Sequence, residues 1–154
     1  MKKTIYLVVV LSIILNIALV YLFLIKGETV KSADGRTAII MNKDNKDFVL
    51  AEMRDFLESV QQINEGIVND NSQLIIDAGK KSGGSVIEHA PKGMLKTLPA
   101  GFKSLGFSTH DIFDKISIKA QENYSKEGAQ QQLNTLLNNC IACHRSYKIE
   151  VKTE

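Results

Sequence analysis

The residues best suited to chemistry lie near the C-terminus, in the stretch NNCIACHRSY from Asn138 to Tyr147. This stretch contains both cysteines of the chain, Cys140 and Cys143, and one of its three histidines, His144. On a helix, residues three and four apart project from the same side, so these three side chains form a compact triangle. Thiols and an imidazole grouped in this way can attach a cofactor, bind a metal ion or exchange a disulfide.

Three kinds of site compete for these residues. A structural zinc site needs four nitrogen or sulfur ligands, and only His89 and His110 remain to complete one. A dithiol redox pair usually lies at a helix N-terminus beside a sheet, where the helix dipole lowers the thiol pKa, whereas this pair is expected near the C-terminal end of its helix with no predicted sheet. In a c-type haem site, both thiols form thioethers with the haem vinyl groups and the adjacent histidine binds the iron. The pattern favours one covalent haem, attached by Cys140 and Cys143 with His144 as proximal iron ligand, and leaves zinc binding and thiol exchange as alternatives.

The helix that carries this triangle is predicted to begin at Ser125. Its apolar and site residues fall on one broad helical face: Leu133, Leu136, Leu137, Cys140, Ile141, His144 and Tyr147. Tyr147 is expected to have a structural role, packing one turn beyond His144.

Three further helices are predicted to enclose the same interior. An apolar stripe follows Asp47, the predicted N-cap, at steps of three and four: Val49, Met53, Phe56, Val60, Ile63 and Ile67. A second helix is predicted to start at Ser72, and a third is capped by Ser108 or Thr109. Prolines and glycines break residues 85–106 into short helical turns. Since no stretch alternates as a strand does, we predict an all-α fold, an antiparallel four-helix bundle.

The N-terminus carries a long apolar run from Ile5 to Ile25. At about 1.5 Å per residue it covers roughly 31 Å, which matches the ~30 Å hydrocarbon core of a bilayer. Lys2 and Lys3 precede it, so the N-terminus stays in the cytoplasm and the rest is exported. A cleaved signal peptide is the alternative, but its apolar stretch is shorter and ends in small residues. We predict that residues 1–26 form an N-terminal transmembrane helix, an uncleaved anchor in the inner cell membrane that leaves the remainder on its periplasmic or outer side.

The 154 residues suffice for about one domain beyond this anchor. Residues 27–46 are polar and rich in turn formers, so they are predicted to be a tether in which only residues 38–41 are ordered. Residues 47–150 are predicted to form the haem domain. The net charge of +2, the 6% aromatic content and the lack of a basic block argue against nucleic acid as a partner.

A Cys-x-x-Cys-His motif on the last of four helices resembles the class II cytochromes c, the cytochrome c prime family. The resemblance covers about residues 46–150 and rests on CIACH at 140–144, on Tyr147 and on the four-helix pattern. It implies one covalent haem within an antiparallel bundle, whose sixth iron position is empty in some members and filled by a first-helix methionine in others. Met53, in LAEMRDFL, is the matching residue, and Met94 is a second candidate. In the family an arginine usually precedes the distal residue by one turn, whereas Arg54 follows Met53.

The remaining candidate residues have simpler interpretations. His89 lies among glycine and proline residues and is expected in a surface loop. His110 is expected to assist the N-terminal cap of the third helix. Arg54 and Arg145 can pair with haem propionates, because a guanidinium matches a carboxylate geometrically, or they remain solvated.

No group of residues in the sequence has the pattern of a catalytic site, so we do not expect an enzyme. The predicted function is that of a membrane-anchored monohaem cytochrome, which carries single electrons by Fe(III)/Fe(II) cycling. Its partners would be membrane or periplasmic redox proteins, and the architecture is compatible with a homodimer. The alternative is a five-coordinate haem protein that binds nitric oxide or carbon monoxide for sensing or protection.

Overall fold

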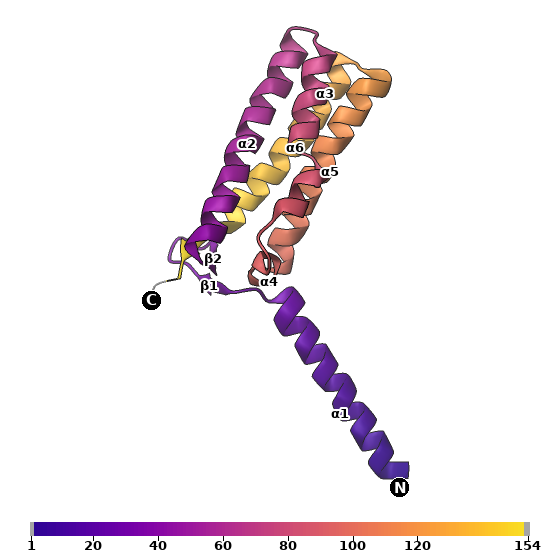
Figure 1. The fold of residues 1–154 in the computed structure, drawn as a ribbon, viewed down its shortest axis with the longest axis vertical. Coiled ribbons are helices and arrows are strands. Elements are labelled where there is room, and N and C mark those ends of the chain that lie inside the picture. The colour runs from indigo at the N-terminus through magenta and orange to yellow at the C-terminus, as the bar shows by residue number, and fades with distance from the viewer. Residues whose placement is uncertain (1, 153–154) are drawn as a thin grey trace.

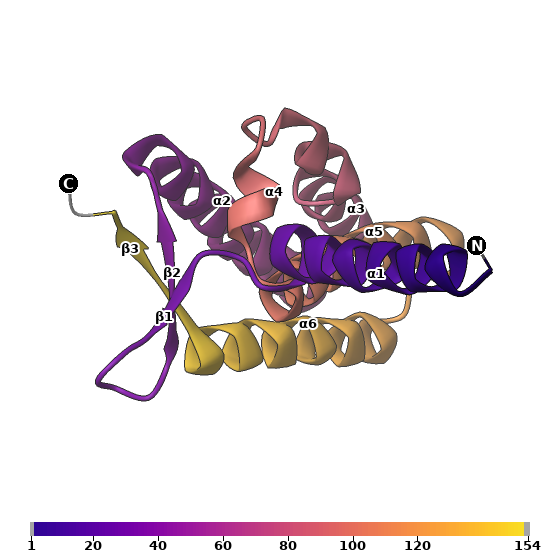
Figure 2. The ribbon, with the colours of Figure 1, turned by 90° about the horizontal axis from the view of Figure 1, so that it is seen from below.

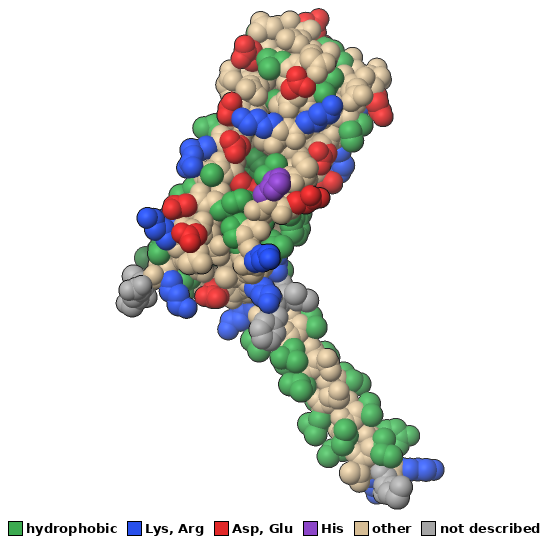
Figure 3. All heavy atoms as spheres, viewed as in Figure 1, with side chains coloured by type: hydrophobic (Ala, Val, Ile, Leu, Met, Phe, Trp, Pro, Cys, Tyr) green, Lys and Arg blue, Asp and Glu red, His purple; other side chains and the backbone are tan. Residues whose placement is uncertain are grey.

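A computed structural model of the protein describes residues 2–152, except the side chains of residues 23 and 24. An apolar helix, α1 (Lys2–Val20), continues into the π-helical turn η1 (Tyr21–Ile25) and projects away from the folded domain (Figure 1). None of its described residues is buried, and the exposed side chains along it are mainly hydrophobic (Figure 3). The Asn16 amide donates to the carbonyl of Ser12 at 2.8 Å, so this polar group is satisfied within the helix. By length and composition, α1 can cross a membrane or act as a signal sequence.

Four longer helices form the body of the domain (Figure 1). They are α2 (Lys43–Val68), α3 (Ser72–Lys81), α5 (Ala100–Asn123) and α6 (Lys126–Ser146). α3 packs against both α2 and α5, and α6 packs against α5 and α2. The prediction of a predominantly helical domain behind an apolar N-terminal helix is therefore confirmed.

The side chains that cap these helices decide where each one begins. The Asn42 side chain accepts a hydrogen bond from the backbone N–H of Asn45 at 2.8 Å, so α2 starts one turn before the predicted cap, Asp47. Ser125 accepts from the N–H of Gly128 at 3.2 Å and caps α6, as predicted. A short polar side chain at the N-cap satisfies an N–H group that the helix itself leaves unpaired.

α5 begins two turns before the predicted caps, Ser108 and Thr109. Its N-cap is Pro99, which has an extended backbone with φ of −69° and ψ of 153°. Pro99 and Gly101 lie in the segment predicted to be broken into short turns, but neither prevents a helix at its first turn, where backbone N–H groups have no intrahelical partner. The prediction for the start of the third helix was therefore wrong.

Two short elements connect α3 with α5. They are the 3₁₀ helix η2 (Gly84–His89) and the single turn α4 (Met94–Thr97), which agree with the short helical turns predicted here. The segment after α1 docks on α4: the N–H of Glu28 donates to the carbonyl of Thr97 at 2.8 Å. Gly27 is required beside it, because its φ is +63° and a Cβ would lie 2.5 Å from the backbone nitrogen of Pro99.

A three-stranded sheet closes the end of the domain nearest α1 (Figure 2). β1 (Thr29–Lys31) pairs antiparallel with β2 (Thr37–Met41), and β2 pairs parallel with β3 (Tyr147–Val151). The prediction that the chain has no strand was therefore wrong, and the predicted tether is largely part of the fold. Ile39 and Met41 are at most 2% exposed, so the predicted ordered patch in this region lies in the core. Short strands that pair across the whole chain leave little local sequence signal.

The buried side chains form two clusters. The upper cluster joins the four long helices: Ile63, Ile67, Ile75, Ile76, Ala78, Phe113, Ile116, Ala120, Ala129, Leu133 and Leu136. The lower cluster lies between the sheet, α2 and the α4–α5 segment: Ile39, Met41, Val49, Met94, Leu98 and Phe102. The inward stripe predicted for the first helix contributes to both, which confirms its orientation.

Candidate functional site

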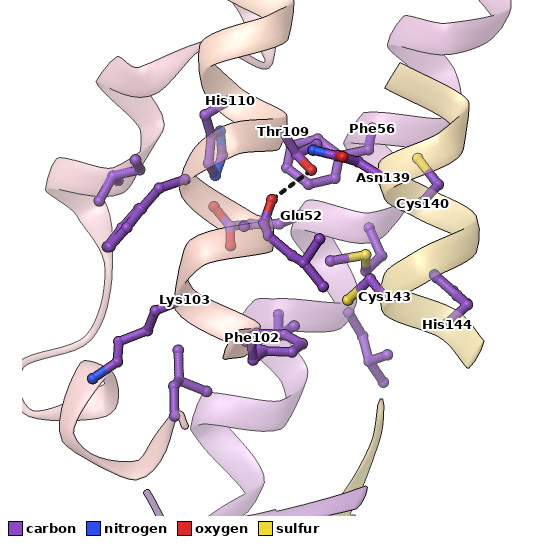
Figure 4. A pocket seen from close by; sticks show the side chains of 18 of the residues that line it. Glu52, Phe56, Phe102, Lys103, Thr109, His110, Asn139, Cys140, Cys143 and His144 are labelled. Carbon is purple, nitrogen blue, oxygen red and sulfur yellow. Dashed lines mark hydrogen bonds between the residues drawn. The ribbon is translucent and has the colours of Figure 1, made fainter. Parts of the chain in front are cut away.

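An apolar cavity of about 530 Å³ lies between the two clusters (Figure 4). Its walls come from α2, the η2–α4 segment, α5 and α6. Leu98 and Phe102 of the lower cluster line it, as do Phe56 and Val60, which pack against the upper cluster. The volume falls in the range of roughly 300–1,000 Å³ that is typical of sites for small molecules and cofactors.

Cys140, Cys143 and His144 all line this cavity from α6. Figure 4 shows the two cysteine side chains on successive turns of that helix. Both thiols are free and half-buried, while His144 is exposed. The three residues that the sequence grouped on one helical face therefore share one wall of an apolar cavity.

The electrostatic environment of the thiols argues against a reactive dithiol pair. Burial raises the pKa of Cys140, and burial followed by the neighbouring Cys140 raises the pKa of Cys143 to about 11. Redox-active cysteines have the opposite property, a lowered pKa that provides a thiolate near neutral pH. Within residues 2–152, no group of three His, Cys, Asp or Glu side chains is arranged to hold a bare metal ion.

The end of α6 is held by contacts with other elements. The Asn139 amide donates to the hydroxyl of Ser108 on α5 at 3.0 Å. Tyr147 leaves the helix and begins β3, where it pairs with Thr37, and its ring packs edge-on against Phe102 with centroids 5.5 Å apart. Tyr147 therefore has a packing role, as predicted, but it lies in a strand and not on a further turn of the helix.

The other predicted residues divide between the cavity and the surface. Met53 and Met94 both line the cavity; Met53 is half-buried, and Met94 is 4% exposed within the lower cluster. Arg54 is exposed at the edge of the cavity. Arg145 and His89 are exposed and do not line it. The surface position predicted for His89 is confirmed.

His110 does not assist an N-terminal cap, because α5 begins at Ala100, well before this residue. It is 6% exposed in the middle of α5, and its Nδ1 lies 2.9 Å from the carbonyl oxygen of Ser82. His110 also lines the cavity, so the expected helix-end residue belongs to the site.

Two charged side chains of the cavity were missed by the sequence reasoning. Glu52 and Lys103 line it from α2 and α5 (Figure 4). Burial, and secondarily the negative charge of Asp55, raises the pKa of Glu52 to about 7. The available signal for Glu52 was its place three residues after Val49, on the edge of the apolar stripe.

No protein-family model, curated protein or solved structure matches this chain.

Proposed function

We propose that the protein is a membrane-anchored c-type cytochrome that carries single electrons. The observation that carries the proposal is the placement of Cys140, Cys143 and His144 along one wall of an apolar cavity. Two thiols and an imidazole at this helical spacing match the attachment pattern of c-type haem, and the cavity provides the volume beside them.

The residues present fit a covalently attached haem. Cys140 and Cys143 would hold the macrocycle through two thioethers, and His144 would be the proximal iron ligand. Both thiols are free, and the walls of the cavity are largely apolar, as a flat and mostly apolar macrocycle requires. Arg54 at the cavity edge offers a guanidinium to a propionate.

The helical packing supports the resemblance to class II cytochromes c. α2 and α3 are joined by a short turn, as are α5 and α6, and short links favour antiparallel neighbours. We therefore infer an antiparallel four-helix bundle made of α2, α3, α5 and α6, with the site on its last helix. The sheet would be an addition to that plan at one end.

When bound, the haem iron supplies reversible one-electron exchange between Fe(III) and Fe(II). The chain's own contribution is a fixed and largely apolar surrounding. Leu98, Phe102 and Phe56 present apolar surface to the cavity, while the contacts of Asn139 and Tyr147 fix the end of α6. Fixed surroundings keep the reorganisation that accompanies a change of charge small.

The N-terminal helix would place this site at a membrane. With α1 as an uncleaved anchor in the inner membrane, the haem domain would lie on the periplasmic or outer side. Tethering raises the effective concentration of the domain near membrane and periplasmic redox proteins, which are the proposed partners.

Covalent attachment provides the direct test. Co-expressed with a haem-ligation system, the full chain should keep haem-linked peroxidase staining through denaturing electrophoresis. Cys140→Ser and Cys143→Ser should each weaken this staining, whereas His89→Ala, a change at an exposed histidine outside the cavity, should leave it intact. An unstained wild-type band would overturn the proposal. A stained protein with a five-coordinate, high-spin reduced spectrum would instead favour binding of nitric oxide or carbon monoxide.

A further inference from the structure

One histidine of the cavity has a nitrogen for which the fold provides no partner. His110 is 6% exposed, and its Nδ1 lies 2.9 Å from the carbonyl oxygen of Ser82. A carbonyl oxygen can only accept a hydrogen bond, so Nδ1 is the donor, and in the neutral ring Nε2 has the lone pair. Within residues 2–152, no side chain or backbone group forms a hydrogen bond with Nε2.

The ring of His110 is held in place from three directions. Phe56 on α2 packs edge-on against it, with ring centroids 5.0 Å apart and an interplanar angle of 70°. Ser82, the hydrogen-bond acceptor, is 1% exposed at the end of α3, and its hydroxyl is hydrogen-bonded to that of Ser59 at 2.8 Å. The backbone of α5 supplies the third constraint. An imidazole fixed in this way loses little conformational freedom when it binds a ligand.

The position of the ring relates it to the proposed haem site. His110 lines the same cavity as Cys140 and Cys143. Figure 4 shows it on α5, across the cavity from the wall that α6 forms. A group attached to Cys140 and Cys143 would therefore lie between α6 and His110.

We propose that His110 binds the haem iron through Nε2 as the distal ligand, opposite His144. This inference rests on the proposed function, because it requires a haem in the cavity. A metal-binding histidine almost always donates its other ring N–H to a carbonyl or carboxylate, and the Ser82 carbonyl provides that partner here. Nε2, which has no protein partner in a residue that lines the cavity, is then available to a ligand there.

Met53, the distal ligand suggested by the sequence, is placed differently. It packs against the lower cluster together with Cys143, so its surroundings are those of a core-filling residue. Two histidine ligands would also give the protein a lower reduction potential than a histidine and a methionine, because methionine ligation raises the potential. We therefore expect a reduction potential at the low end of the range for c-type cytochromes.

The haem-loaded full chain allows a direct test by spectroscopy. Electron paramagnetic resonance and near-infrared magnetic circular dichroism of the oxidised protein should show low-spin iron with two nitrogen ligands. His110→Gln should convert the iron to a high-spin form that binds carbon monoxide, while Met53→Leu and His89→Gln should leave the low-spin signal unchanged. In a His110→Gly variant, added imidazole should restore that signal by entering the vacated space.

Several results would overturn the assignment of His110. A low-spin signal that is lost in Met53→Leu and kept in His110→Gln would identify the thioether as the ligand. High-spin iron in the wild-type protein would show that no side chain ligates on the distal side. Each of these results still requires attached haem, so they differ from the loss of haem staining that would overturn the proposed function.

Discussion

Two glycines inside helices should respond in opposite ways to the same substitution. Gly79 lies where α3 crosses α5, and a Cβ there would be 2.7 Å from the carbonyl oxygen of Phe113 and 2.8 Å from the Cβ of Ser117. At Gly106, within α5, a Cβ would point into open space, with no atom of the described residues within 4 Å apart from its chain neighbours and the nearby backbone of α5. Replacing each by alanine separates the gain in helix propensity from the cost of the contact.

The expected magnitudes follow from these distances. Glycine to alanine inside a helix stabilises by about 1 kcal/mol, so Gly106→Ala should raise the free energy of unfolding by about that amount. At Gly79 the same gain is opposed by overpacking, which costs about 1–3 kcal/mol. The obstructing atoms belong to or directly adjoin the backbone of α5, so α3 and α5 must separate, and we expect a net loss of up to about 2 kcal/mol.

Urea unfolding followed by far-ultraviolet circular dichroism measures this difference. Both variants are best made with Cys140 and Cys143 changed to serine, which removes the proposed haem attachment. The midpoint should fall for Gly79→Ala and rise for Gly106→Ala, with the slope of the transition unchanged. A Gly79→Ala protein as stable as Gly106→Ala would refute the close approach of α3 and α5, and with it the placement of the Ser82 carbonyl beside His110.

Three further outcomes are expected. Burial raises the pKa of Glu52 from 4.5 to about 7, so the folded protein keeps this proton longer than the unfolded chain and loses stability as the pH rises through that window. In the same cysteine-free background, urea unfolding should show a free energy of unfolding about 1–2 kcal/mol lower at about pH 8 than at about pH 4, after allowance for solvent screening, and Glu52→Gln should abolish this difference. If Glu52→Gln left the pH dependence as unchanged as the exposed control Glu65→Gln does, the reasoning would be contradicted. Gly27→Ala should speed proteolysis of the segment after α1 more than Gly35→Ala, which shares a positive φ but has open space around it, and equal cleavage rates would argue against docking on α4. Deleting residues 1–26 behind a cleavable export signal should yield a soluble protein, whereas the full chain should need detergent for extraction; a natural N-terminus after Lys26 would identify a signal peptide instead.

The sequence predicted those features that depend on neighbouring residues. The apolar stripe from Val49 to Ile67, the cap at Ser125 and the common face of Cys140 and Cys143 all follow from helical spacing, and the structure places them accordingly. The pairing of β2 with β3 could not be predicted, because the two strands are far apart in the sequence and each has only five residues.

The polar groups of the cavity needed the tertiary structure for the same reason. His110 follows a serine and a threonine, which locally resemble a helix start. Only the earlier start of α5 and the approach of Ser82 from α3 turn it into a buried residue. Local capping signals compete with tertiary packing, and at this position the packing decides.

The parallel pairing of β2 with β3 also bears on the order in which the protein can assemble. β2 is made early, but its partner is the last strand of the chain and directly follows the helix that carries Cys140, Cys143 and His144. Contacts between such distant segments form slowly, because a long loop must close before they give any stability. The end of the helix that carries Cys140, Cys143 and His144 therefore gains its contact with the sheet only late in folding, after the helices around it can already have packed.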